Sequence, residues 1–137
     1  MTFREMLAKQ LEIDEGRRSK LYKCSAGKLS IGVGRNLEDR GLRDSEIDLM
    51  LDNDIAEAIQ TARKLFPGFE RLSDVRKAVL CNIAFQLGET RLSAFRGVRA
   101  AVEAQAWSLA ADEMLDSAWS KQTPKRAVRL AEQMRNG

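Results

Sequence analysis

The sequence predicts an α+β protein that is mostly helical, with a small β-containing N-terminal lobe, a long connecting helix and a helical C-terminal lobe. Three features predict this architecture. One short segment alternates apolar and polar residues between turn formers, and a long apolar stripe at helical spacing follows it. A later segment is apolar on almost every side, which is typical of a helix at the centre of a lobe. A chain of 137 residues fits one domain built from such lobes.

In the N-terminal half, the first helix is expected over residues 3–15, where apolar residues recur at helical spacing until Gly16 ends the pattern. The small β lobe is expected over about residues 16–43, because alternating apolar residues there are interrupted by Gly and Ser at turn positions. The connecting helix is expected over about residues 45–66, where an apolar stripe runs to a Pro-Gly break.

The C-terminal half, residues 67–137, is expected to form the helical lobe. A helix beginning at Ser73 becomes apolar all round from Ala78 to Leu87, and Gly88 is expected to stop it. Three more helices are expected, over residues 95–104, over 107–116, and from Thr123-Pro124 onward, where proline occupies the first helical position.

The composition excludes several kinds of chemistry. Without histidine, no Ser-His-Asp or Cys-His nucleophile and no His-ligated zinc is possible, and two cysteines make no metal cluster. We therefore expect no cofactor and no metal, which leaves carboxylate chemistry or no chemistry at all. The net charge of +3 favours an anionic partner such as the bacterial wall, a membrane surface or a nucleic acid. A nucleic acid is the weakest option because basic residues are dispersed and aromatic residues make up only 6%.

Charged residues at two helix ends break the rules of the helix dipole. Asp14 and Glu15 lie in the last turn of the first helix, where the dipole disfavours a carboxylate. They are either a tolerated surface pair or contain a carboxyl that stays protonated at neutral pH as a general acid. Arg126 lies in the first turn of the last helix, and close to a cleft its guanidinium could pair with a carboxylate or a substrate group.

Polar residues also fall on or beside the apolar central helix. Asn82 and Gln86 need partners if they are buried, so each either forms an internal hydrogen bond or presents an amide to a substrate. Phe85 lies between them in the same stretch.

Together, four segments resemble the tailed-phage lysozymes, the glycoside hydrolases typified by the lysozyme of T-even phages. The segments occur in the family's order and cover nearly the whole chain: Ile13-Asp14-Glu15-Gly16, Tyr22 to Gly27 with Ile31 to Gly34, Phe85 to Thr90, and Gln122 to Arg126. The family's motif is Glu, eight residues, Asp or Cys, five residues, then Thr. Here Glu15 and Cys24 match the first spacing, and Ser30 takes the third place.

The resemblance implies a single lysozyme-like domain, with the first helix packing with the C-terminal lobe. It also implies that Glu15 protonates the glycosidic oxygen, that Cys24 assists a water or stabilises positive charge, and that Ser30 positions that water. Arg126 matches the family's partner of the catalytic Glu. The implied substrate-binding residues are Asn36, Phe85 and Gln86.

The sequence also departs from the family. Arg35 replaces the histidine that commonly follows the Gly-x-Gly turn, and Asp54 occupies the position of that histidine's partner, so we expect a charge pair here. Cys24 replaces the second carboxylate found in many members.

Three functions stay open. The first is a phage endolysin, a muramidase that hydrolyses the bond between N-acetylmuramic acid and N-acetylglucosamine for host lysis. The second is a lytic transglycosylase using Glu15 alone, and the third is a non-catalytic basic module that binds the wall. We expect a monomer that acts on peptidoglycan glycan strands, binds no nucleic acid and does not insert stably in a membrane. The N-terminus has no signal-like apolar run. The protein is therefore expected in the host cytoplasm, reaching the periplasmic wall after a holin disrupts the membrane.

Overall fold

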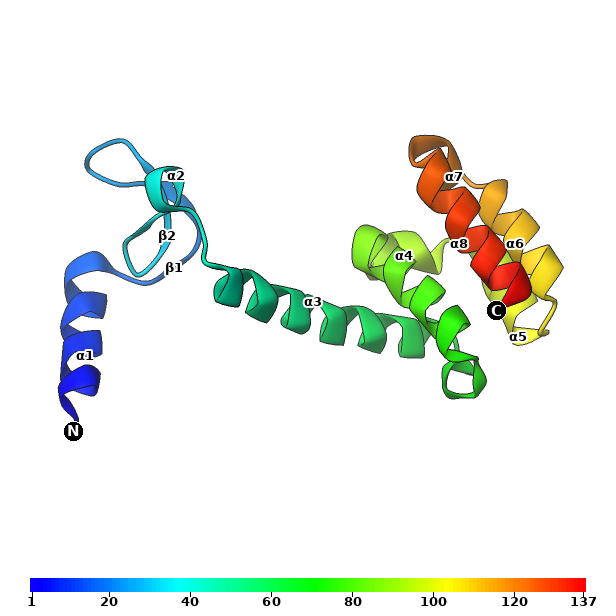
Figure 1. Cartoon of the computed structure of the whole chain (residues 1–137), viewed down its shortest axis with the longest axis horizontal. Coiled ribbons are helices and arrows are strands. Elements are labelled where there is room, and N and C mark those ends of the chain that lie inside the picture. Colours follow the sequence, from blue (N-terminus) through cyan, green and yellow to red (C-terminus); the bar gives the residue numbers. More distant parts are fainter. The chain divides into compact units, whose positions relative to one another are not determined.

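The computed structural model describes residues 1–137, which divide into two compact units, Met1–Leu49 and Met50–Gly137. The fold is mostly helical with one small antiparallel sheet, as predicted (Figure 1). The first unit holds α1, the sheet and α2, and the second holds α4 to α8. Helix α3 (Asp44–Leu65) is continuous across the division, and no helix is long and apolar enough to cross a membrane.

Helix α1 (Phe3–Glu15) has the predicted bounds, and both of its ends are capped. At its start, the side chain of Thr2 accepts a hydrogen bond from the backbone of Glu5, whose carboxylate accepts one from the backbone of Thr2, both at 3.1 Å. At its end, Gly16 adopts a φ of 79° and donates its N–H to the carbonyl of Glu12. Glu15 is therefore held as the last helical residue.

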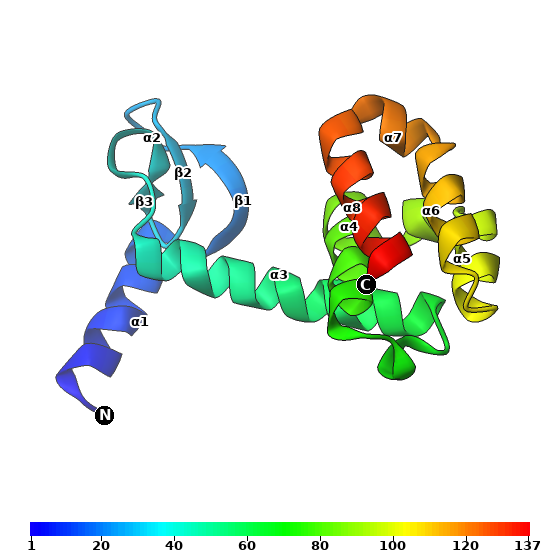
Figure 2. The same cartoon turned by 45° about the vertical axis from the view of Figure 1, so that its right-hand side comes forward.

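The sheet contains β1 (Arg18–Lys23), β2 (Leu29–Gly32) and β3 (Arg35–Asn36), in that order and antiparallel (Figure 2). Pairing between β1 and β2 is irregular between Arg18 and Tyr22. The short helix α2 (Leu37–Arg40) follows β3 directly and lies beside the sheet. This helix falls where the sequence predicted only the end of the β lobe.

In the second unit, α4 (Asp74–Ser93) is the central helix, as its apolar sequence predicted. Ser73 caps it by accepting a hydrogen bond from the backbone of Arg76 at 3.2 Å. Gly88 interrupts it with a φ of 79°, so the predicted stop is a kink after which helical residues resume. The largest fully buried side chains of this unit come from α4, α6 and α8: Val79, Leu80, Ile83, Leu92, Met114 and Met134.

The remaining helices surround this core. A short 3-10 turn (Phe69–Arg71) follows α3, and the helices after α4 are α5 (Arg96–Glu103), α6 (Trp107–Leu115), α7 (Ala118–Gln122) and α8 (Pro124–Asn136). Helix α8 packs against α4, α6 and α7 (Figure 1). The sequence predicted α5, α6 and the start of α8 at Pro124, but it did not predict α7.

Candidate active site

Glu15 lies at the exposed C-terminal end of α1, directly against the turn that joins β2 to β3. A Cβ placed on Gly34 would lie 2.8 Å from Oε2 of Glu15. Within its own unit the Glu15 side chain has no hydrogen bond or ion pair, whereas the neighbouring Glu12 is paired with Arg17 at 2.8 Å. Within its unit, no other group of the protein occupies the Glu15 carboxyl, so the carboxyl is free to exchange a proton with a bound molecule.

Cys24 begins the tight turn that leads from β1 into β2. Its backbone N–H donates to the carbonyl of Lys28 at 2.9 Å, and its carbonyl accepts from Gly27 at 2.8 Å. The backbone N–H groups of Lys28 and Ala26, with a smaller effect from the Ser30 hydroxyl, lower the pKa of the Cys24 thiol. Donors that favour the charged form have this effect, so the turn increases the fraction of thiolate at neutral pH.

Ser30 is the only buried polar residue of the first unit, with 2% of its surface exposed. Its hydroxyl donates to the carbonyl of Lys28 at 3.2 Å, so it is oriented by the same turn that holds Cys24. In the sheet Ser30 pairs with Tyr22 on one side and Asn36 on the other. Two of the predicted catalytic residues, Cys24 and Ser30, thus lie together.

Asn36 has a clear local role as the cap of α2. Its Oδ1 accepts from the backbone of Asp39 at 3.1 Å, and its Nδ2 donates to the Asp39 carboxylate at 3.0 Å. Both ends of the amide are therefore engaged within the β lobe. The predicted role in substrate binding stays a prediction.

Within the first unit, Arg35 is held by Glu46. The two guanidinium nitrogens lie 2.8 and 2.6 Å from the two carboxylate oxygens, which is a bidentate pair. The guanidinium, together with the backbone N–H of Arg43, lowers the pKa of Glu46 to about 2. Glu46 lies in the first turn of α3, where it also accepts from the backbone of Arg43 at 2.7 Å. The pair expected between Arg35 and Asp54 stays a prediction.

Arg126 is fixed in the second unit by Asn82 of α4. Its Nε and Nη2 donate to Oδ1 of Asn82 at 2.9 and 2.6 Å, and Nη2 also approaches the Asn82 carbonyl at 3.3 Å. Both residues line a groove of ≈ 560 Å³ that also includes Phe85, Ile55 and Ile59. Asn82 was predicted to find either an internal or a substrate partner, and within the lobe it holds the arginine.

Gln86 is the acceptor for a buried tryptophan. Its Oε1 accepts from Nε1 of Trp119, which is 2% exposed, at 2.9 Å. Phe95 packs against the same indole with a ring-centre distance of 6.2 Å. Gln86 thus has a structural partner, although its side chain is also exposed.

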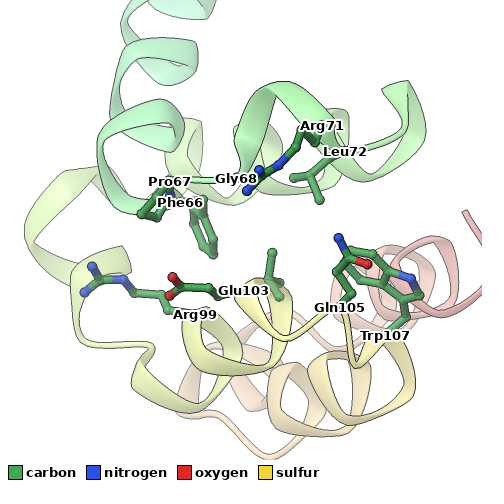
Figure 3. Close-up of a pocket in the computed structure, with 10 residues that line it drawn as sticks. Phe66, Pro67, Gly68, Arg71, Leu72, Arg99, Glu103, Gln105 and Trp107 are labelled. Carbon is green, nitrogen blue, oxygen red and sulfur yellow. The ribbon is translucent and has the colours of Figure 1, made fainter.

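A second concavity, between the end of α3 and the turn from α5 to α6, contains none of the predicted site residues (Figure 3). Glu103 and Gln105 lie along one side of it and Arg71 on the other. Its volume of ≈ 60 Å³ is far below the roughly 300–1,000 Å³ of ordinary ligand sites. No group of three or more His, Cys, Asp or Glu side chains is arranged to hold a metal ion.

The chain resembles known proteins over nearly its whole length. The phage lysozyme family model matches residues 12–135. Probable T4-type lysozyme 2 of Dictyostelium discoideum is 26% identical over 90% of this chain and 90% of its own length. Probable T4-type lysozyme 1 of the same organism is also 26% identical, over 93% of this chain and 92% of its own length. The pre-baseplate central spike protein Gp5 of Enterobacteria phage T4 is 26% identical over 90% of this chain but only 26% of its own length.

Proposed function

Since the chain belongs to the phage lysozyme family, it is a glycoside hydrolase of the lysozyme type, and we propose that Glu15 is its general acid. The proposed reaction is hydrolysis of the bond between N-acetylmuramic acid and N-acetylglucosamine in bacterial peptidoglycan, for host-cell lysis. The observation that carries the proposal is the Glu15 carboxyl, which is exposed and unpaired within its unit and belongs to the last residue of a capped helix. Such a carboxyl can protonate the leaving oxygen of a glycosidic bond.

Glu15→Gln tests this role, because the amide keeps the size of the side chain but cannot donate the proton. Loss of general acid catalysis should lower the reaction rate by ~100- to 10,000-fold. The variant should therefore not clear a suspension of outer-membrane-stripped cells. Asp14→Asn is the matched control, since Asp14 is an exposed carboxylate in the same helical turn. Activity of Glu15→Gln within a few-fold of wild type, or equal loss in both variants, would remove Glu15 from this role.

We further propose that Cys24 serves as the second group of the reaction, either as base or as a nearby anion. Glycosidases usually use two carboxyl groups, and the turn that lowers the Cys24 pKa makes a thiolate available in place of the carboxylate. An unperturbed thiol would be only a few per cent ionised at pH 7. Ser30, oriented by the same turn, would then position the attacking water.

Three measurements test Cys24. Cys24→Asp should stay active, Cys24→Ala should lose most activity, and a bulky thiol reagent should inactivate the enzyme. Cys81→Ala is the control for the reagent, because burial raises the pKa of the Cys81 thiol, which should react more slowly. A Cys24→Ala protein of full activity would show that Cys24 only packs.

A lytic transglycosylase is the second candidate, and the missing carboxylate at Cys24 favours it. That reaction needs one acid/base carboxyl, because the sugar's own hydroxyl closes the ring. Mass spectrometry of digested peptidoglycan separates the two reactions, since hydrolysis leaves reducing ends and cyclisation leaves anhydro sugars. We propose hydrolysis, so reducing ends should dominate. Binding to peptidoglycan without any cleavage would instead support a wall-binding module.

The proposed setting is the host cytoplasm, from which a monomeric enzyme reaches the periplasmic wall once a holin has opened the membrane. Expression of the chain alone should therefore leave host cells intact, and co-expression with a membrane-disrupting protein should lyse them. Lysis by the chain alone would contradict the dependence on a holin.

A further inference from the structure

The turn between β2 and β3 approaches the Glu15 carboxyl at a position without a side chain. A Cβ placed on Gly34 would lie 2.8 Å from Oε2, 3.0 Å from Cδ and 3.1 Å from Cγ of Glu15. Real Cβ atoms essentially never lie closer than 3.0 Å to another heavy atom. The outer half of the Glu15 side chain thus rests on the backbone of Gly34, in space that any other residue would fill.

This contact is specific to one glycine of the lobe. Gly32, two residues earlier in the same turn region, has a φ of 70°, close to the 67° of Gly34, but a Cβ there would meet nothing within 4 Å. Both positions need a left-handed conformation that favours glycine. Only at Gly34 does the absence of a side chain also make room for Glu15.

We propose that Gly34 is a positioning residue that sets the place of the Glu15 carboxyl, an inference that rests on the proposed role of Glu15 as general acid. Glu15 is exposed and has no hydrogen bond or ion pair within its unit, and its outer atoms lie against the backbone of Gly34, in the space that a Cβ there would take. A methyl group on Gly34 would push the flexible carboxyl aside at little cost to the fold. The same displacement would move the proton donor away from the glycosidic oxygen.

Misplacement of a reacting group by about 1 Å can cost ~100-fold in rate. Gly34→Ala should therefore lower kcat by ~100-fold while KM stays within a few-fold. Gly32→Ala is the matched control, because it brings the same left-handed strain without touching Glu15. It should shift the denaturation midpoint about as much as Gly34→Ala, while its kcat stays within a few-fold of wild type.

A second pair of variants keeps the test valid if the alanine variants do not fold. Asparagine tolerates the left-handed region better than alanine, so Gly34→Asn and Gly32→Asn place the same Cβ with less strain. An activity-independent measurement is the ¹³C chemical shift of the Glu15 carboxyl, which should move in the Gly34 variants and not in the Gly32 variants.

The outcomes are separable. Equal kcat in the Gly34 and Gly32 variants would overturn the positioning role, and so would a Glu15 carboxyl resonance that does not move in the Gly34 variants. In either case Glu15→Gln would still test whether Glu15 is the general acid. If Glu15→Gln stayed active, the proposed function would fail, and the ¹³C comparison alone would still decide whether Gly34 places the carboxyl.

Discussion

Removing the acceptor of the Trp119 indole should destabilise the helical lobe measurably. Gln86→Leu keeps most of the side-chain volume but leaves Nε1–H of Trp119 without its partner at 2.9 Å. Because Trp119 is only 2% exposed, water has little access to the indole once its acceptor is gone. An unsatisfied buried donor costs about 1–3 kcal/mol. For a chain of this length that corresponds to a melting temperature lowered by roughly 3–10 °C.

The assay is thermal and guanidinium unfolding followed by circular dichroism, with two controls. Gln86→Glu keeps an acceptor oxygen and should lie close to wild type in stability. Gln122→Leu removes an acceptor from Arg91, but that bond is exposed and 3.3 Å long, so the change should cost less than about 0.5 kcal/mol. If Gln86→Leu were no less stable than Gln122→Leu, the hydrogen bond from Trp119 to Gln86 would not contribute the expected stability.

The remaining predictions concern acid stability, metal ions and Arg126. The Arg35–Glu46 pair should add to the free energy of unfolding at pH values above the ordinary carboxyl pKa of 4.5, and this contribution should be lost as the pH falls through about 2. In Glu46→Gln, the free energy of unfolding should therefore change less with pH between these two values. EDTA should leave lysis unchanged, because no side-chain group is arranged for a metal, and loss of lysis that zinc or magnesium restored would contradict the two-group mechanism. Arg126→Ala should lower activity, and Arg126→Lys should not restore it, because Asn82 accepts from two nitrogens of a planar guanidinium.

Elements with a long apolar period or a strong capping signal were predictable from sequence. Helix α1 has the predicted bounds, and α3 and α8 begin within a residue of the predicted places. Gly88 was identified because a glycine after an apolar helix commonly takes a positive φ. These features depend on neighbours in sequence, so the sequence contains the information.

Short elements and long-range pairings were not predictable in the same way. Helix α2 has four residues, too few to show a period, although the Asn36 cap and Gly41 at its end mark it in retrospect. The pair of Arg35 with Glu46 joins residues 11 apart in the chain. No periodicity or capping signal marks such a pairing, and only the three-dimensional path of the chain brings the two side chains together.

The candidate site shows the same division. The spacing of Glu15, Cys24 and Ser30 was visible in sequence, whereas the contact of Glu15 with Gly34 was not, because glycine in a turn is ordinarily explained by its φ alone. A glycine can meet two requirements at once, and a sequence reveals only the conformational one.

The two amides of α4 explain why a structural bond and a substrate role need not compete. Asn82 and Gln86 each engage their side-chain oxygen, with Arg126 and Trp119 respectively. Fixing the oxygen of a planar amide also fixes the direction of its NH₂ group, which retains its two donors. An amide oriented in this way is prepared to donate to an acceptor such as a sugar acetamido carbonyl, with less rotamer entropy to lose on binding. Gln86→Glu separates the two roles, because it keeps an acceptor for Trp119 but replaces the donating NH₂ group with a charged oxygen that can only accept.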